Sequence, residues 1–317
     1  MLAALLSPLA MLSSPLAAAQ DDDAYARLRT ADTRLLGIAA PMMQANARLC
    51  QINMPLADIS LHGADQYANP PERWFADGPV AISAVVSGSA AESAGLSPDD
   101  ALLAIGDIAL DLLSAQNGTP RRDAVFAALA SQNGAQIPLT IRRDGAEEVI
   151  ILPARPACRV MVEIVTGGNR IARSDGKVIQ IGYDLAHELT DEQLASVFAH
   201  ELAHVVLLHR IRLEAEGVSK GLAGQFGRNQ RLNREVEVEA DRMSVHLLAN
   251  AGYDPQIAPQ FWRSEEGRKI DRGILRSWTY PSATGRAEIL EREIALYLPL
   301  GRGPSWPAHL LDHRTPP

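Results

Sequence analysis

The segment from His200 to His204, which reads HELAH, restricts the fold of this chain more than any other part of its sequence. Four residues at about 100° each bring the second imidazole to within about 40° of the first, one helical turn further along. On a helix both imidazoles therefore leave the same face and can bind one metal ion, for which zinc is the natural choice. A chance match is expected on the order of 0.01 times in a chain with 8 histidines among 317 residues. The segment thus predicts a helix that carries a metal site.

The residues before this segment predict where its helix begins. Thr190 and Gln193 form a capping box, and apolar residues then recur at helical intervals. A similar segment at His187 reads HELTD, so Asp191 stands where the second histidine would be, and the helix cap falls inside it. We therefore expect the metal site at His200 and not at His187.

A catalytic zinc site needs a third protein ligand and keeps one position open for water. His209 lies about 140° around the helix from the last histidine of the segment, so it is predicted to point away from the metal and to pack or cap the helix end. A second predicted helix, residues 235–250, offers carboxylates: Glu237 and Asp241 share a face, whereas Glu239 lies on the opposite side. The pair fits one ligand and one carboxylate that receives the remaining N–H of a ligand histidine. A solvated acidic helix face is the alternative.

Charge and cysteine content exclude several other functions. The chain has 30 basic and 38 acidic residues and a net charge of −8, so it lacks the basic excess that binding to nucleic acid requires. Its 2 cysteines, Cys50 and Cys158, are far apart in sequence, which excludes a cysteine-based zinc site or an iron–sulfur cluster.

The first nineteen residues carry no charge and end in three alanines. They are typical of a secretory signal peptide that is cleaved near Ala19, although no basic residue precedes the apolar stretch. We therefore expect a periplasmic or secreted protein, with a membrane anchor formed by an uncleaved N-terminal segment as the alternative. No stable membrane span is expected in the mature chain, because no other apolar run is long enough. In an oxidising compartment Cys50 and Cys158 could pair.

The chain is predicted to be α+β, with a mainly helical domain that holds the metal site and a small β-sheet, and with an inserted β-rich module. The Asp175-Gly176 turn signal predicts a hairpin in the small sheet. The predicted boundaries are a leader at residues 1–19, an N-terminal helical part of the metal domain at 20–73, the β-rich module at 74–157, the rest of the metal domain at 158–300 and a flexible tail at 301–317.

Several motifs in fixed order resemble one known family. The HELAH segment is followed by Glu-Val-Glu-Ala-Asp at 237–241, by Gly-Tyr-Asp-Pro at 252–255 and by Phe261-Trp262. This order is similar to that of the HtpX-like and CAAX-prenyl-endopeptidase family of gluzincin metalloproteases, particularly its soluble periplasmic members, over residues of about 160–297. The resemblance implies a zincin fold, one zinc ion per chain and Glu237 as the third ligand, with Asp241 behind the ligands.

The resemblance also suggests roles for residues outside the ligand set. Asn169 matches an asparagine on the strand before the active helix, and in the family the edge strand there pairs with the substrate backbone. This chain reads Thr279-Tyr280-Pro281 where the family commonly has Thr-His-Pro. Either Tyr280 approaches the metal or the oxyanion in place of that histidine, or the regulatory feature is absent. Arg286 resembles a family arginine that supports the site, and it is the other candidate for stabilising the transition state.

Residues 79–107 resemble the PDZ domains of bacterial proteases, and the match covers about residues 75–156. PDZ domains bind extended chain ends by adding a strand to their own sheet, so the resemblance implies a C-terminal peptide ligand. A spacer or a lid without a ligand is the alternative. Cys50 and Cys158 flank the insertion, and a disulfide between them would clamp its root, with two free thiols as the alternative.

The function that these patterns predict is hydrolysis of peptide bonds in proteins, misfolded or envelope proteins by resemblance. Glu201 lies on the metal helix without being a ligand, and it would act as the general base on a zinc-activated water. The alternative is a PDZ-based protein-binding or chaperone-like factor with an idle metal site.

Overall fold

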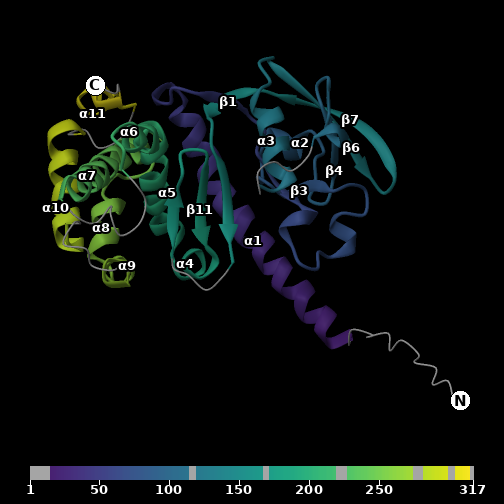
Figure 1. The fold of residues 1–317 in the computed structure, drawn as a ribbon, viewed down its shortest axis with the longest axis horizontal. Helices are drawn as coiled ribbons and strands as arrows, with labels where there is room; N and C mark the ends of the chain where they lie inside the picture. The colour runs from purple at the N-terminus through teal and green to yellow at the C-terminus, as the bar shows by residue number, and fades with distance from the viewer. Residues whose placement is uncertain are drawn as a thin grey trace, which may run out of the picture.

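A computed structural model describes residues 15–113, 119–166, 171–218, 227–273, 281–298 and 304–314. The chain forms a mainly helical part with a small sheet and, beside it, a β-rich module, as Figure 1 shows. The predicted α+β class is confirmed. Each of the two parts has its own hydrophobic core.

Helix α1 (Pro15–Ala45) runs along both parts of the molecule (Figure 1). Its C-terminal half is buried, with Leu35 at 1% and Met42 at 0% exposure, and it contacts strands of both parts and the metal-site helix. Pro41 lies inside the helix, and the short 3-10 helix η1 (Ala47–Leu49) follows it. Helix α1 therefore packs in the core of the helical part and also contacts the β-rich module.

The helical part is built around the helix that carries HELAH. Helix α5 (Asp191–Val206) begins at the predicted capping box, in which Thr190 Oγ1 accepts a hydrogen bond from the backbone N–H of Gln193. It packs against α7 (Gly227–Asn250), and α10 (Ala283–Tyr297) packs against α7 and α8. Helices α4 (Tyr183–Glu188), α6 (His209–Ala215), α8 (Ile257–Arg263) and α9 (Glu265–Gly273) also belong to this part.

A three-stranded sheet lies beside α5 (Figure 1). Its order is β10 (Ala172–Ser174), β11 (Val178–Gly182) and β9 (Met161–Val165), with β11 antiparallel to β10 and parallel to β9. The predicted hairpin is confirmed: Asp175 Oδ1 accepts hydrogen bonds from the backbone N–H groups of Lys177 and Val178, and Gly176 has a φ of 86°. The edge strand β10 contacts α5, so a sheet edge lies close to the metal-site helix.

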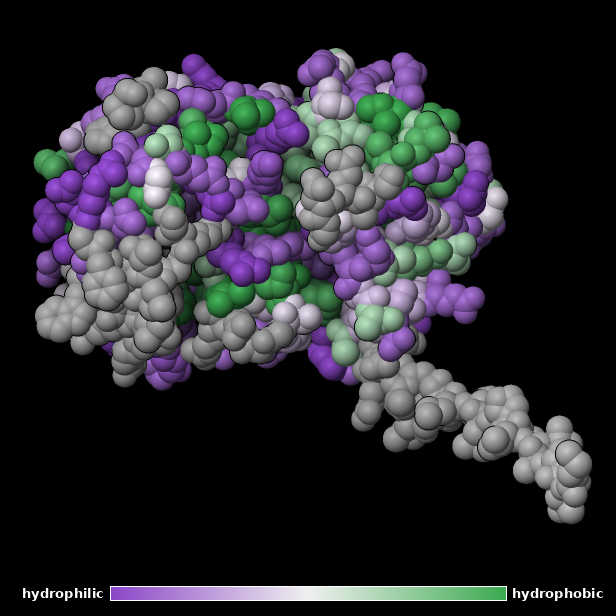
Figure 2. Space-filling model, in the orientation of Figure 1, coloured by the Kyte–Doolittle hydropathy of each residue, from purple (hydrophilic) through white to green (hydrophobic). Residues whose placement is uncertain are grey.

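The β-rich module is a sheet of strands in the order β2 (Ile59–Gly63), β3 (Val80–Val85), β4 (Ala101–Ile105), β6 (Gln136–Arg143) and β7 (Ala146–Pro153), with β5 (Ile108–Ala109) added to β4. Helices α2 (Ala90–Ser93) and α3 (Arg121–Ala130) belong to the same module. On the face in Figure 2, hydrophobic residues gather over the β6 and β7 region, where Val149 is 63% and Ile151 45% exposed. The edge strand β7 thus leaves apolar side chains outside the core.

The predicted start of this module at residue 74 is wrong. Strand β2 lies before that residue, pairs antiparallel with β3 and buries Leu61 in the module core. Its apolar alternation is too short to identify a strand without its partner. Residues of about 57–73 therefore belong to the β-rich module and not to the helical part.

The module leaves and re-enters the helical part through a paired root. Strand β1 (Asn53–Leu56) pairs antiparallel with β8 (Arg155–Cys158). The predicted disulfide between Cys50 and Cys158 is present beside this pair. The segment between the cysteines, which have a sequence separation of 108, is thus tied at both ends.

The expected flexible tail is not borne out over residues 304–314. Helix α11 (Ala308–Leu311) buries Leu310 and Leu311, which are 1% and 6% exposed. Arg314 Nη1 also donates a hydrogen bond to the backbone oxygen of Leu49 at 2.6 Å. Two leucines in a proline-rich segment suffice to dock it on the helical part.

Among the described residues, no single helix has the length and apolar content needed to cross a membrane. Helices α5 and α6, which are bent relative to each other, together have the length and composition of a span, and only these two properties point to one. Most of α5 is buried inside the helical part, where it carries the histidines of the metal site.

Candidate metal centre

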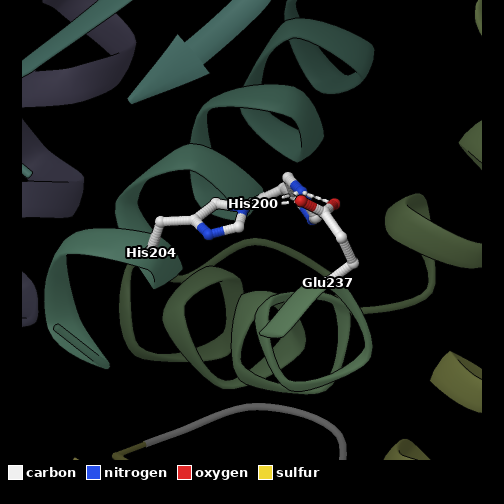
Figure 3. Close-up of side chains that lie close together, drawn as sticks. All are labelled: His200, His204 and Glu237. Carbon is white, nitrogen blue, oxygen red and sulfur yellow. Dashed lines mark hydrogen bonds and ion pairs between the residues drawn. The ribbon is translucent and has the colours of Figure 1, made fainter. Parts of the chain in front are cut away.

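Helices α5 and α7 bring three potential metal ligands together. Figure 3 shows His200 and His204 on α5 facing Glu237 on α7. His200 Nε2 lies 3.2 Å from His204 Nε2 and 3.2 Å from one carboxylate oxygen of Glu237, and His204 Nε2 lies 3.7 Å from the other oxygen. The structure thus places the carboxylate at position 237 where the resemblance puts the third ligand.

These separations fit a zinc ion. Four tetrahedral ligands at 2.0–2.2 Å from zinc lie about 3.3 Å from one another. The two imidazoles also direct Nε2 atoms at each other, which suits a shared cation better than a hydrogen bond. The donor set therefore fits zinc by chemistry and by spacing.

The charges of the site indicate that it accommodates a cation. Burial disfavours the charged form of His200, but hydrogen bonds to Asp241 and Glu237 outweigh it and raise the pKa of that imidazole to about 10. Burial lowers the pKa of His204 to about 3. Burial opposes ionisation of Glu237, yet the two histidines hold the pKa of its carboxyl well below its usual range. The carboxylates thus hold a positive charge where the ion would lie.

Asp241 and Arg286 lie behind His200. Asp241 Oδ1 is 3.0 Å from His200 Nδ1, and Arg286 donates to both oxygens of Asp241, at 2.7 and 2.5 Å. This is the outer hydrogen bond that fixes the orientation of a metal-bound histidine. Because the guanidinium is occupied by this carboxylate, the geometry favours the supporting role for Arg286 over a role at the oxyanion.

Glu201 is buried at 7% exposure, although it is an acidic residue without a ligand role. Burial raises the pKa of its carboxyl to about 7, and the nearby Glu237 adds to this shift whereas His200 opposes it. A pKa near neutrality is the property that a general base requires at physiological pH. The environment of Glu201 therefore suits the predicted role.

His209 is buried beside His204, in a contact that the sequence analysis did not predict. Helix α5 ends at Val206, and Leu208 takes a left-handed conformation with a φ of 56°, so α6 begins in a new direction at His209. This break brings His209 Nδ1 to 2.8 Å from His204 Nδ1. The sequence analysis missed this contact because it extended one helix through the break, which no glycine or proline marks.

A second cluster of potential ligands, missed by the sequence analysis, joins α7, α10 and the C-terminal segment. His246 Nε2 and His309 Nε2 lie 3.0 and 2.7 Å from the same oxygen of Glu293. Arg242 donates to its other oxygen at 2.6 Å, and Ser305 Oγ is 2.7 Å from His246 Nδ1. These distances are those of hydrogen bonds, and Arg242 balances the carboxylate charge. The cluster therefore fits a structural role that holds the C-terminal segment.

Two residues of the predicted site, Asn169 and Tyr280, lie outside the described residues. The edge strand that follows Asn169 in the chain is β10, which contacts α5.

No family model matches the chain. It is 31% identical over 144 residues to the mitochondrial metalloendopeptidase OMA1 of Arabidopsis thaliana, covering 38% of this chain and 28% of that protein. A Vibrio cholerae protein named as a beta-barrel assembly-enhancing protease is 27% identical over 158 residues, covering 40% of this chain and 33% of that protein. The OMA1 of Schizosaccharomyces pombe is 24% identical over 121 residues, covering 37% and 36%.

The chain thus spans about a third of the length of the relatives it matches. All three are named as proteases, and two as metalloendopeptidases, which is consistent with a hydrolytic enzyme and supports a metalloprotease class.

Proposed function

We propose that this protein is a zinc-dependent endopeptidase. The observation that carries the proposal is the spacing of the ligand atoms. Those of His200, His204 and Glu237 lie 3.2, 3.2 and 3.7 Å apart, and the ligands of one zinc ion are expected to lie about 3.3 Å apart. The similarity to metalloendopeptidases over part of the chain supports the same class.

The chemistry of peptide cleavage divides between the ion and the chain. Zinc bound by these three residues would polarise the scissile carbonyl and lower the pKa of a bound water toward about 7. Glu201 accepts the proton of the attacking water and returns it to the leaving amine nitrogen. Asp241 holds His200 by Nδ1, so the Nε2 of His200 is kept free on the side where the ion would bind. Tyr280 remains the proposed donor to the oxyanion.

Substrate would bind as an extended chain along the small sheet. Strand β10 lies at the edge of that sheet and contacts α5, so a peptide paired with this edge would pass close to the metal ligands. Pairing with a strand edge reads the peptide backbone and leaves side-chain sequence largely unrestricted. Asn169, which precedes β10 in the sequence, is proposed to take part in substrate binding. Such binding suits proteins with unfolded segments, misfolded or envelope proteins among them.

We propose that the β-rich module is a PDZ-like unit that binds chain ends of substrates or partners. Its edge strand β2 lies beside helix α3. A PDZ ligand adds as a further strand at such an edge, between the strand and a helix. The small cavity there, about 30 Å³ in volume and lined by Ile59 and Leu61 of β2 and by Phe126 of α3, has room for a water molecule and not for a peptide, so a ligand would have to add along the strand edge. The position of this strand edge beside a helix favours the second candidate function, a protein-binding factor.

Digestion of unfolded casein tests the proposal. Zinc-loaded protein should cleave internal bonds, and an excess of chelator should abolish the cleavage until zinc is restored. The Glu201→Gln variant should retain zinc and lose cleavage. A zinc-loaded protein that binds casein but cleaves none of it would favour the binding function.

The location of the protein is also a proposal. The leader-like first nineteen residues and the disulfide between Cys50 and Cys158 support a periplasmic or secreted protein, because stable disulfides belong to oxidising compartments. Fractionation of cells with an alkaline phosphatase fusion to the first thirty residues tests export.

A further inference from the structure

The break after α5 places a third histidine in contact with a proposed zinc ligand. His209 Nδ1 lies 2.8 Å from His204 Nδ1, and the two ring centroids are 4.9 Å apart at an angle of 75°. His209 is 2% exposed. Its other nitrogen, Nε2, lies 3.1 Å from Glu239 Oε2, and Arg212 Nη1 donates to that carboxylate at 2.6 Å.

The positions of the protons in this chain of contacts follow from its two ends. At one end, His204 directs Nε2 at the ion, so its proton is on Nδ1. That N–H can donate only if His209 Nδ1 is unprotonated, which places the proton of His209 on Nε2. At the other end, the Glu239 carboxylate can only accept, and it takes that proton in a hydrogen bond. Every contact then has one donor and one acceptor.

We propose that His209 and Glu239 are positioning residues that hold His204 in the tautomer and orientation of a zinc ligand. The inference rests on the proposed zinc site. In most zinc proteins the outer nitrogen of a ligand histidine meets a carboxylate, a backbone carbonyl or a water directly. Here Asp241 does so for His200, whereas Glu239 reaches His204 through an intervening imidazole.

Helix α7 carries acidic residues on two of its faces, and the two faces serve different histidines. Glu237 binds the ion, Asp241 lies one turn further on the same face and holds His200, and Glu239 lies on the other side of the helix. Only the turn at Leu208, which starts α6 beside α7, brings an imidazole within reach of Glu239.

Zinc affinity of the full chain, measured by competition with a chelating indicator, tests the role of His209. His209→Leu removes both hydrogen bonds and should weaken zinc binding about 10- to 100-fold. His209→Gln keeps an acceptor for His204 and a donor for Glu239, so it should bind zinc within about 3-fold of the unmodified protein. Rescue by glutamine is not expected if His209 merely fills space.

His246→Leu is the matched control. His246 is also buried and also bonded to a glutamate, but it belongs to the cluster that holds the C-terminal segment. This variant should lower the melting temperature and leave the zinc affinity unchanged. The inference is overturned if His209→Leu binds zinc as tightly as His246→Leu, or if His209→Gln binds no better than His209→Leu.

A second measurement does not depend on the folding of any variant. Long-range nitrogen–proton correlation spectra of the unmodified zinc-loaded protein report which imidazole nitrogen carries each proton. We expect a proton on Nδ1 of His204 and on Nε2 of His209, and the opposite tautomer of His209 would overturn the inference. A protein that binds no zinc would overturn the proposed function as well, whereas normal zinc binding with unaffected His209 variants would overturn this inference alone.

Discussion

The guanidinium carbon of Arg286 lies 3.6 Å from the centroid of the Trp262 ring. The same guanidinium donates to both oxygens of Asp241, which in turn accepts from His200. Three helices, α5, α7 and α10, are thus joined through one buried arginine, and α8 supplies the aromatic face that covers it. An arginine in this position stabilises the ligand set and is not free to approach a substrate.

This relationship predicts the effect of Arg286→Lys. Lysine keeps the charge but cannot donate to both carboxylate oxygens or stack in the same way, so zinc affinity should fall about tenfold. Indicator competition measures the affinity. Arg242→Lys is the control, because Arg242 donates a hydrogen bond to Glu293 in the second cluster, which is not part of the metal site. Equal zinc affinities of the two variants would contradict the supporting role.

Glu201→Gln should separate metal binding from catalysis. Glutamine preserves the shape of the side chain but cannot take a proton from water, so the rate of peptide cleavage should fall by about 10²- to 10⁴-fold with zinc still bound. Glu192→Gln, an exposed change on the same helix, should leave the rate unchanged. A Glu201→Gln variant that cleaves casein at the unmodified rate would assign the general base elsewhere.

The disulfide at the root of the β-rich module should contribute to stability and not to metal binding. Replacing Cys50 and Cys158 by serine frees a loop with a sequence separation of 108 residues, which should lower the free energy of unfolding by about 2–5 kcal/mol. Urea denaturation measures this change, with zinc affinity as the parallel readout. A loss of zinc affinity at unchanged stability would refute the prediction.

Asp32 should make the protein less stable as the pH rises. Burial raises the pKa of its carboxyl from 3.8 to about 7 in the folded protein, and the nearby Glu163 adds to this rise. The hydrogen bond that Asp32 accepts from the backbone N–H of Ile164 opposes the rise without cancelling it. The folded state therefore binds more protons than the unfolded state between about pH 4 and 7, and this contribution to stability is lost as the pH rises through that window.

Asp32→Asn removes this dependence and can still accept the hydrogen bond from Ile164. Between pH 5 and pH 8 the variant should gain about 2 kcal/mol on the unmodified protein, which is less than the full shift converts to because Asp32 keeps some contact with solvent. Denaturation curves at the two pH values measure the gain. A constant difference between the two proteins would rule out titration of Asp32 in this range.

Local signals account for the parts of the fold that the sequence predicted well. The capping box at Thr190 and the turn at Asp175 each depend on neighbouring residues, and each lies where it was expected. The ligand geometry was predictable for the same reason, because the spacing of His200 and His204 on one helix fixes their common face.

Contacts between distant segments account for the features that the sequence did not predict. Leu208 adopts a left-handed conformation without a local signal, so the contact of His209 with His204 could not be foreseen. Strand β2 becomes a strand through pairing with β3, and Leu310 and Leu311 are held by a core formed elsewhere in the chain. Tertiary packing decides each of these features.

The most direct test of the account is a crystal structure of the zinc-loaded protein with anomalous data at the zinc edge. We predict one zinc ion bound by Nε2 of His200, Nε2 of His204 and a carboxylate oxygen of Glu237, at 2.0–2.2 Å, with one position left for water. A zinc ion bound instead by His246, Glu293 and His309, or a Glu237 side chain directed away from the two imidazoles, would contradict it.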